Sequence, residues 1–403
     1  MPVAISGLVF WVLVALATVT SLLTAWALGA NSNSPPFAPA IGANAISTMK
    51  AAFLIGILAA LGALTQGGSI SETVGAGLIA NAQITSLGAI AGLLTAAGFM
   101  AFGVYSGYPV PAAFATTGAM VGVGLSLGGD PVYGTYRRIA LFWVLVPPVS
   151  GGLAYLTAKI LRRDDIPETL GIPLLAAVVG AIVANIRLSV IPAPAGEPQG
   201  TLAGLPGLLV DSAVLQTAGA ALVTLLVAAA SFHFIRRRTQ DSVDRGTKTF
   251  LVVLGSVVAF SSGGSQVGLA TGPLENLYSA ELGVPGIVLL TLGAVGILGG
   301  AWMGAPRLLQ ATSREYAQLG VRRSIAALVP GFVIAQAAIT LGIPISFNNI
   351  IISGVIGGGL AGGTAGVSRR KIAVTVSFWL ITLVSSTAIG FGLYRALATV
   401  LGV

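Results

Sequence analysis

The chain has 403 residues, of which only 8% are charged and 55% are hydrophobic, and 55 are glycine. Because a soluble domain carries about 25% charged residues, this composition excludes a soluble protein with a charged surface. The absence of cysteine excludes disulfides and thiolate metal sites, and we assign the net charge of +8 to cytoplasmic loops rather than to a nucleic-acid partner.

Apolar segments recur along the whole chain. A bilayer core of about 30 Å is crossed by a helix of about 20 apolar residues. We therefore predict an all-α polytopic membrane protein with about twelve spans. The predicted segments lie at 6–28, 48–66, 86–104, 110–127, 138–161, 170–191, 209–236, 248–277, 284–305, 324–341, 345–362 and 372–397.

The basic residues predict how the spans are oriented. Cytoplasmic loops of membrane proteins are enriched in Lys and Arg. One short loop carries Arg236, Arg237, Arg238, Arg245 and Lys248, and counting spans from it places sixteen of the 20 basic residues on the same side. We therefore expect a multi-pass protein of the cell membrane, embedded in the lipid bilayer, with both termini external.

The sequence contains an internal repeat at a spacing of about 230 residues. Each half opens with an apolar helix that runs into a glycine-rich break, at 29–42 and at 262–274, and later has a Gly-x-Pro hairpin, at 107–114 and at 342–349. The first half starts outside and the second inside, so the repeat is inverted, as in many secondary transporters. We predict broken helices and re-entrant-type hairpins in three parts: a first inverted repeat (1–165), linking spans with the basic loop (166–247) and a second inverted repeat (248–403).

The breaks and hairpin tips predict a binding site for a small anion. Unwound backbone in a bilayer is tolerated only where it lines a cavity or is buried in protein. A helix N-terminus also presents free N–H groups and a partial positive charge. Helix starts are expected after the first break, at the second break, at Pro111 and at Ser346. The predicted substrate-binding residues are Asn31, Ser32, Ser34, Ser265, Gln266, Ser346, Asn348 and Asn349.

These features also have simpler interpretations. Glycines in membrane helices usually allow close packing, and Pro111 can simply shape its hairpin. Glu275 follows the second break at membrane depth and is the candidate coupling carboxylate, although it also fits a residue near the outer edge. The sequence shows no catalytic triad, metal cluster or nucleotide loop, so we expect neither an enzyme nor a cofactor or metal.

At these motifs the chain resembles the inorganic phosphate transporter (PiT) family. The first half of that family's pattern, G-A-N-D-x-A-N-x(5)-V-G, is matched by Gly29, Ala30, Asn31, Ile41 and Gly42. The second half, H-G-A-N-D-V-A-N-A-x-G-P-L, is matched by Gly263, Val267, Ala270, Gly272, Pro273 and Leu274. The resemblance covers nearly the whole chain and implies twelve spans, a homodimer, and uptake of phosphate with a coupling cation.

The departures from the family's pattern concern the coupling ion and the substrate. Ser32 and Gln266 stand where the family has aspartates, which the resemblance assigns to sodium coordination. We therefore expect a phosphate permease that is not coupled to sodium, in which sulfate competes measurably with phosphate. The alternatives are a proton-coupled sulfate permease, an uncoupled channel-like pore for anions, and a membrane protein that has lost transport.

Overall fold

A computed structural model of the chain describes residues 7–33, 35–106, 110–163, 165–193, 199–210, 212–310, 313, 320–363 and 369–402. In this part of the chain, nine helices are long and apolar enough to cross a membrane, and three shorter apolar helices accompany them. Together they correspond one by one to the twelve predicted segments. The prediction of an all-helical polytopic membrane protein is thus confirmed.

The first half of the chain contains the elements α1 (Gly7–Asn31), η1 (Pro35–Phe37), α2 (Ala38–Gly42), α3 (Thr48–Gln66), α4 (Gly68–Ala76), β1 (Ile79–Ala80), α5 (Ser86–Ser106), α6 (Ala112–Ser126), β2 (Asp130–Pro131) and α7 (Tyr133–Ile160). The two strands form a short antiparallel ribbon. The first predicted break is confirmed, because α1 ends at Asn31 and a new 3-10 turn starts at Pro35.

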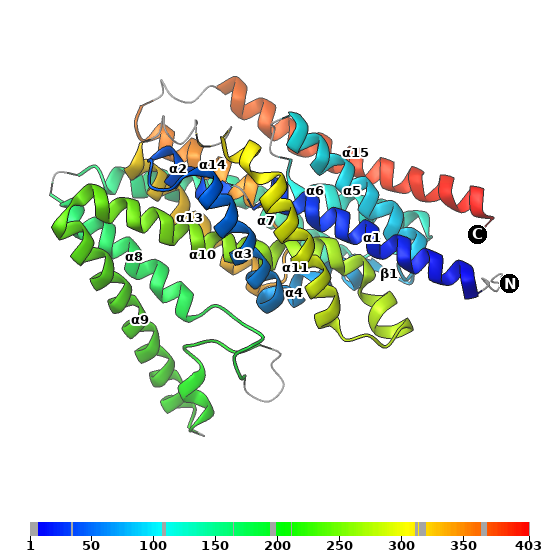
Figure 1. Cartoon of the computed structure of the whole chain (residues 1–403), viewed down its shortest axis with the longest axis horizontal. Coiled ribbons are helices and arrows are strands. Elements are labelled where there is room, and N and C mark those ends of the chain that lie inside the picture. The colour runs from blue at the N-terminus through cyan, green and yellow to red at the C-terminus, as the bar shows by residue number, and fades with distance from the viewer. Residues whose placement is uncertain are drawn as a thin grey trace.

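The second half contains α8 (Glu168–Ala184), η2 (Leu205–Leu208), α9 (Ala213–Asp241), α10 (Val243–Thr271), η3 (Gly272–Leu274), η4 (Leu277–Glu281), α11 (Gly286–Met303), α13 (Val321–Thr340), α14 (Phe347–Leu360) and α15 (Arg369–Leu401). The helices α8 and α9 form a pair at the periphery of the bundle (Figure 1). The boundaries proposed for the three parts of the chain stay a prediction.

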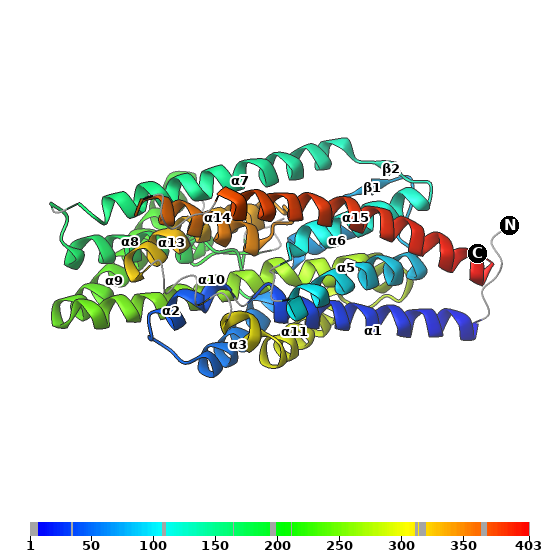
Figure 2. The ribbon, with the colours of Figure 1, turned by 90° about the horizontal axis from the view of Figure 1, so that it is seen from above.

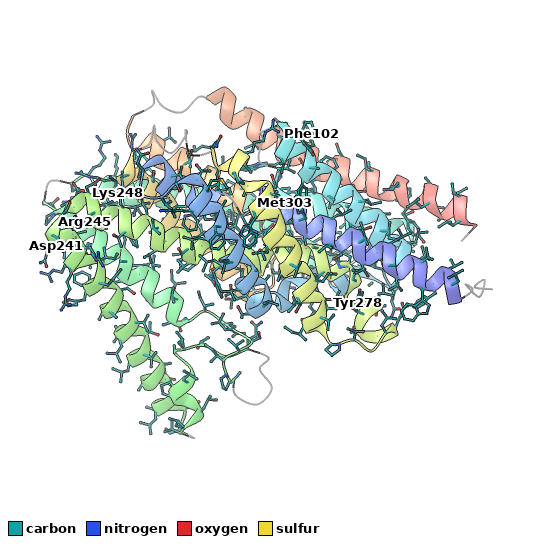
Figure 3. The ribbon with its side chains drawn as sticks, viewed as in Figure 1. Phe102, Asp241, Arg245, Lys248, Tyr278 and Met303 are labelled. Carbon is teal, nitrogen blue, oxygen red and sulfur yellow. The ribbon has the colours of Figure 1, made fainter. Side chains whose placement is uncertain are left out.

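The two ends of the helix bundle carry different features. The amino-terminal end of α1 and the carboxy-terminal end of α15 lie at the same end (Figure 2). Arg245 and Lys248, which belong to the predicted cytoplasmic loop, lie at the other end (Figure 3). The termini and this basic loop are thus on opposite sides, as the distribution of charge predicts. Which end faces the cytoplasm stays a prediction.

The first helix of each repeat packs against a helix of the other repeat, and glycines lie at both contacts. A Cβ atom added at Gly29 of α1 would lie 2.2 Å from the carbonyl oxygen of Ile297 in α11. In the other repeat, a Cβ atom at Gly263 of α10 would lie 1.9 Å from the carbonyl oxygen of Ala59 in α3. The first helix of each repeat is therefore packed against the other repeat, and only glycine permits the two backbones to approach so closely.

The hairpin helices show the same exchange. Helix α7, which follows the first hairpin, packs on the second, where Ser150 donates to the carbonyl of Ile350 at 2.9 Å. Helix α15, which follows the second hairpin, packs on the first, where Ser386 donates to the carbonyl of Phe114 at 3.3 Å. The corresponding serines of the two repeats make corresponding contacts. The inverted repeat is therefore present in the packing as well as in the sequence.

The second predicted break lies later in the chain than expected. Helix α10 continues through Ser265 and Gln266 to Thr271, and its geometry changes only at Gly272. The expectation that Ser265 and Gln266 occupy a helix break is therefore wrong. The glycines of this segment serve packing instead, because a Cβ atom at Gly268 would lie 2.5 Å from the backbone nitrogen of Ser71.

Substitution of Gly263 tests the importance of these crossings. Gly263→Ala places a methyl group against the carbonyl of Ala59, and overpacking of this kind costs about 1–3 kcal/mol. The matched control is Gly392→Ala in α15, where an added Cβ atom meets nothing within 4 Å. We expect Gly263→Ala alone to lower the thermal unfolding midpoint of the purified protein. Equal midpoints for the two variants would contradict this account of the crossing.

Candidate functional site

Three of the sequence motifs meet at one backbone carbonyl. The side-chain amide of Asn31, in the first break, donates to the carbonyl oxygen of Val110 at 2.9 Å. The amide of Asn348, in the second hairpin, donates to the same oxygen at 2.8 Å. All three residues are fully buried or nearly so. The break of one repeat and the hairpin tips of both are thereby joined at a single point.

Two helix N-termini adjoin this carbonyl. Helix α6 begins after Pro111, and helix α14 begins after Ser346, as the sequence predicts. Neither residue caps its helix with a side-chain hydrogen bond. The first N–H groups of a helix have no partner within the helix, and they give its N-terminus a partial positive charge. The positive ends of two helices therefore lie next to Val110 and Asn348.

Trp143 of α7 holds the two hairpin tips together. Its ring stacks on the ring of Phe114 with a centroid separation of 3.8 Å. Its indole nitrogen donates to the carbonyl of Pro344 at 2.9 Å. One side chain thus contacts the start of α6 and the extended segment before α14. This contact fixes the distance between the two helix N-termini.

Helix α10 supplies a further polar face. Ser262 donates to the side-chain oxygen of Asn33, and the carbonyl of Ala270 accepts from Ser21 at 2.9 Å. Gln266 lies one helical turn from Ser262 and from Ala270, on the same side of α10. It therefore faces the stretch of chain from Ser21 in α1 to Asn33 in the break after α1. Ser265 lies one turn after Ser261, which accepts a hydrogen bond from Gln336 of α13.

Several buried polar atoms in this region lack a protein partner within the described part of the chain. A buried polar group without a hydrogen bond costs about 1–3 kcal/mol, so a cluster of such groups indicates a place for a polar ligand. Side-chain amides and hydroxyls can both donate to an anion. The unpaired atoms that can donate are the amide nitrogens of Asn33 and Gln266 and the hydroxyls of Thr116, Thr117 and Ser265. The amide oxygens of Asn31, Gln266, Asn348 and Asn349 are also unpaired, and these can only accept.

The predicted site residues fall into three groups. Asn31 and Ser32 lie with Ser346, Asn348 and Asn349 around the hairpin tips, where Asn31 also contacts the Ser32 hydroxyl at 3.3 Å. Ser265 and Gln266 approach from α10 without a helix break. Ser34 lies outside the described residues. Glu275 belongs to a different place, described below.

Sequence reasoning missed four contributors to this region: Asn33, Val110, Trp143 and Ser262. Asn33 and Ser262 were both inside the motifs that the sequence analysis singled out, and their pairing depends on how α1 and α10 cross. Trp143 and Trp379 follow the two hairpins at matching positions, which was a signal for a role at the tips. The carbonyl of Val110 is a backbone group, so the identity of its side chain gave no signal.

Glu275 lines a separate cavity of about 280 Å³, which we call the outer cavity after the orientation predicted from the basic residues. It lies between the ends of α3 and α13, helix α4, the segment after α10, and the connection from α8 to α9. Its polar residues are Gln66, Ser69, Glu72, Arg187, Gln199, Glu275, Gln336 and Thr340. Apart from Glu275, none of these was predicted as a site residue, because they come from distant parts of the chain.

The fold combines inverted repeats with interrupted helices, and two helices start beside one buried carbonyl, an arrangement typical of membrane transporters. Comparison with known proteins identifies the class. Residues 28–390 match the Phosphate transporter family, and the chain belongs to this family. The resemblance inferred from the sequence motifs is thereby confirmed, and so is the description of the chain as a multi-pass membrane protein of a transporter family rather than of an enzyme class.

Relatives and a solved structure agree with this assignment. A Thermococcus kodakarensis protein named "Putative phosphate permease" is 25% identical over 97% of this chain and 98% of its own length. The "Inorganic phosphate transporter 2-1, chloroplastic" of Arabidopsis thaliana is 26% identical over 89% of this chain and 68% of its own length. A solved structure described as "The sodium-dependent phosphate transporter" shares the fold, with a TM-score of 0.80 and 22% identity over 96% of this chain and 99% of its own.

Substitutions of Trp143 test its function as a link between the hairpins. Trp143→Phe keeps an aromatic ring on Phe114 but removes the hydrogen bond to Pro344, which should cost about 0.5–1.5 kcal/mol of unfolding free energy. Trp143→Ala also removes the ring and should cost about 3–5 kcal/mol. Trp11→Phe, at a residue that is 59% exposed on α1, is the control. Unfolding in denaturant that does not separate the three variants would contradict this function.

Proposed function

We propose that the chain is a secondary-active permease of the cell membrane that carries inorganic phosphate. The observation that supports this most directly is the convergence of Asn31 and Asn348 on Val110 beside two helix N-termini. Membership of the Phosphate transporter family supports phosphate as the substrate. The names of the relatives point to the same anion.

The central site consists of the buried polar residues around the Val110 carbonyl and the starts of α6 and α14, together with Ser265 and Gln266 of α10, and it binds the anion without a charged side chain. Helices α6 and α14 start beside it. The buried donors without a partner among the described residues are the amide nitrogen of Gln266 and the hydroxyls of Thr116, Thr117 and Ser265. None of the motif residues carries a positive charge. A site of this kind holds a tetrahedral oxyanion through helix dipoles and hydrogen bonds, and it can release the anion more easily than a cluster of arginines would. Movement of the two repeats relative to each other then exposes the site to each side in turn.

Transport is proposed to be independent of sodium. Hard cations prefer oxygen ligands, and carboxylates are the strongest of these in proteins. Ser32 and Gln266 provide no carboxylate at the two positions where the resembling family has aspartate, and Glu275 lies in the outer cavity instead. The solved neighbour is described as sodium-dependent, but at 22% identity its likeness to this chain concerns the fold. Glu275 remains the proposed coupling carboxylate, with the proton as coupling ion.

Sulfate is the second candidate substrate, because a centre without a carboxylate does not repel an anion that carries no proton. The protein is further proposed to act as a homodimer with both termini external. The α8–α9 pair supports a dimer, since α9 lies at the periphery (Figure 1) and buries only Ile235 and Thr239.

The hairpin residues are tested by the double variant Ser346→Ala and Asn349→Ala. Loss of donors that bond a charged ligand costs about 1.5–3 kcal/mol, or roughly ten- to a hundredfold in affinity. Phosphate affinity is measured with purified protein in proteoliposomes. Ser353→Ala is the control, because this hydroxyl bonds within α14, to the carbonyl of Asn349. Wild-type affinity in the double variant would refute the contribution of the hairpin.

Sodium dependence is tested by replacing sodium with choline at constant pH during uptake of labelled phosphate. We expect uptake to stay within about twofold of its value in sodium, because the site lacks the carboxylates that would hold the ion. Uptake that collapses to background in choline would show that hydroxyls and carbonyls alone build a sodium site. An imposed proton gradient in the same vesicles tests the proposed coupling ion.

A further inference from the structure

The outer cavity combines groups that the central site lacks. Its lining includes one arginine, Arg187, and two carboxylates, Glu72 and Glu275. Within the described residues Arg187 forms no ion pair, and it is exposed enough to meet an incoming ion. The side-chain amides of Gln66, Gln199 and Gln336 complete the set of polar groups around it. The cavity therefore offers both a cation and strong hydrogen-bond acceptors.

Two residues that line this cavity also have buried polar atoms without a partner in the described part of the chain. Gln66 is only 1% exposed, and its side-chain oxygen has no partner within the described residues. One carboxylate oxygen of Glu275 is likewise buried without a partner. The amide nitrogen of Gln66 contacts the carbonyl of Arg187 at 3.5 Å, which directs the unpaired oxygen elsewhere. A volume of about 280 Å³ leaves room for an ion and several water molecules, at about 30 Å³ each.

The cavity adjoins the polar face of α10. Gln336 lines the cavity and also donates to Ser261, one turn before Ser265 of the central site. On the opposite wall, Gln66 packs against Gly264, where a Cβ atom would lie 2.5 Å from that of Gln66. A single layer of side chains therefore separates the outer cavity from the helix that carries Ser265 and Gln266.

The chemistry of the cavity distinguishes between two oxyanions. Near neutral pH, phosphate carries one or two protons and can donate a hydrogen bond, whereas sulfate carries none. A carboxylate accepts a hydrogen bond from a protonated oxyanion and repels one that is fully ionised. Arg187 attracts both ions, because its guanidinium matches the geometry of any such oxyanion. The two glutamates therefore favour binding of a protonated phosphate over binding of sulfate in this cavity.

We propose that the outer cavity is a second anion site, which captures hydrogen phosphate on its way to the central site and selects it against sulfate. Arg187 binds the anion, and Glu72 and Glu275 accept hydrogen bonds from its protons. This inference rests on the proposed function, since it assumes that the chain transports phosphate. It locates the selection between phosphate and sulfate outside the central site, which can donate to either.

The test measures exchange of labelled phosphate in proteoliposomes at equal pH on both sides, with sulfate as competitor, because exchange does not require the coupling that Glu275 is proposed to provide. Arg187→Gln should raise the KM for phosphate about tenfold and leave the maximal rate within about twofold. The double variant Glu72→Gln and Glu275→Gln should make sulfate inhibit at a concentration at least tenfold lower than in the wild type. Glu281→Gln and Arg137→Gln, at exposed positions that do not line the cavity, are the matched controls and should behave as wild type.

The outcomes separate this inference from the proposed function. If the wild type does not transport phosphate, the proposed function fails. If the wild type transports phosphate, but Arg187→Gln leaves KM unchanged and the double glutamine variant leaves sulfate inhibition unchanged, the outer site is overturned. The thermal unfolding midpoint of each variant shows whether it is folded. The single variant Glu275→Gln, which should show part of the same change in sulfate inhibition, replaces the double variant if the latter is unstable.

Discussion

Backbone polar groups that leave a helix inside a bilayer must find partners within the protein, because each unsatisfied group costs several kcal/mol. The carbonyl of Val110 is such a group, because it lies just before the start of α6. The amides of Asn31 and Asn348 satisfy it from two other interrupted segments. The two asparagines therefore position the helix starts that the proposed anion site requires.

The exchange of helices between repeats explains how such a centre is held and can still move. Gly29 and Gly263 let helices of opposite repeats cross with their backbones in contact, and Ser150 and Ser386 tie each hairpin to the other repeat. Trp143 joins the hairpin tips, whereas the indole nitrogen of Trp379, its counterpart in the second repeat, has no partner among the described residues. The two repeats are thus alike in architecture and unlike in detail.

The sequence was sufficient for features that depend on short segments. Apolar length predicted the twelve spans, and Ser346 and Pro111 marked helix starts because proline and serine favour those positions. Prediction from the sequence was wrong where one residue type can serve two structural roles. Glycines near Gly268 can break a helix or let another one approach, and only the position of Ser71 shows that the second use applies. The outer cavity was equally hidden, since its residues come from segments far apart in the chain.

The location of the carboxylates connects these observations to function. In a centre built from helix N-termini and amides, a carboxylate beside the anion would repel it unless a cation or a proton lay between them. Ser32 and Gln266 remove that repulsion and leave uncharged oxygens as the acceptors for the protons of phosphate. Glu72 and Glu275 provide charged acceptors in the outer cavity, where Arg187 is available to offset their charge. In a transporter without acidic residues at its centre, charged acceptors in another part of the path therefore strengthen the preference for a protonated oxyanion.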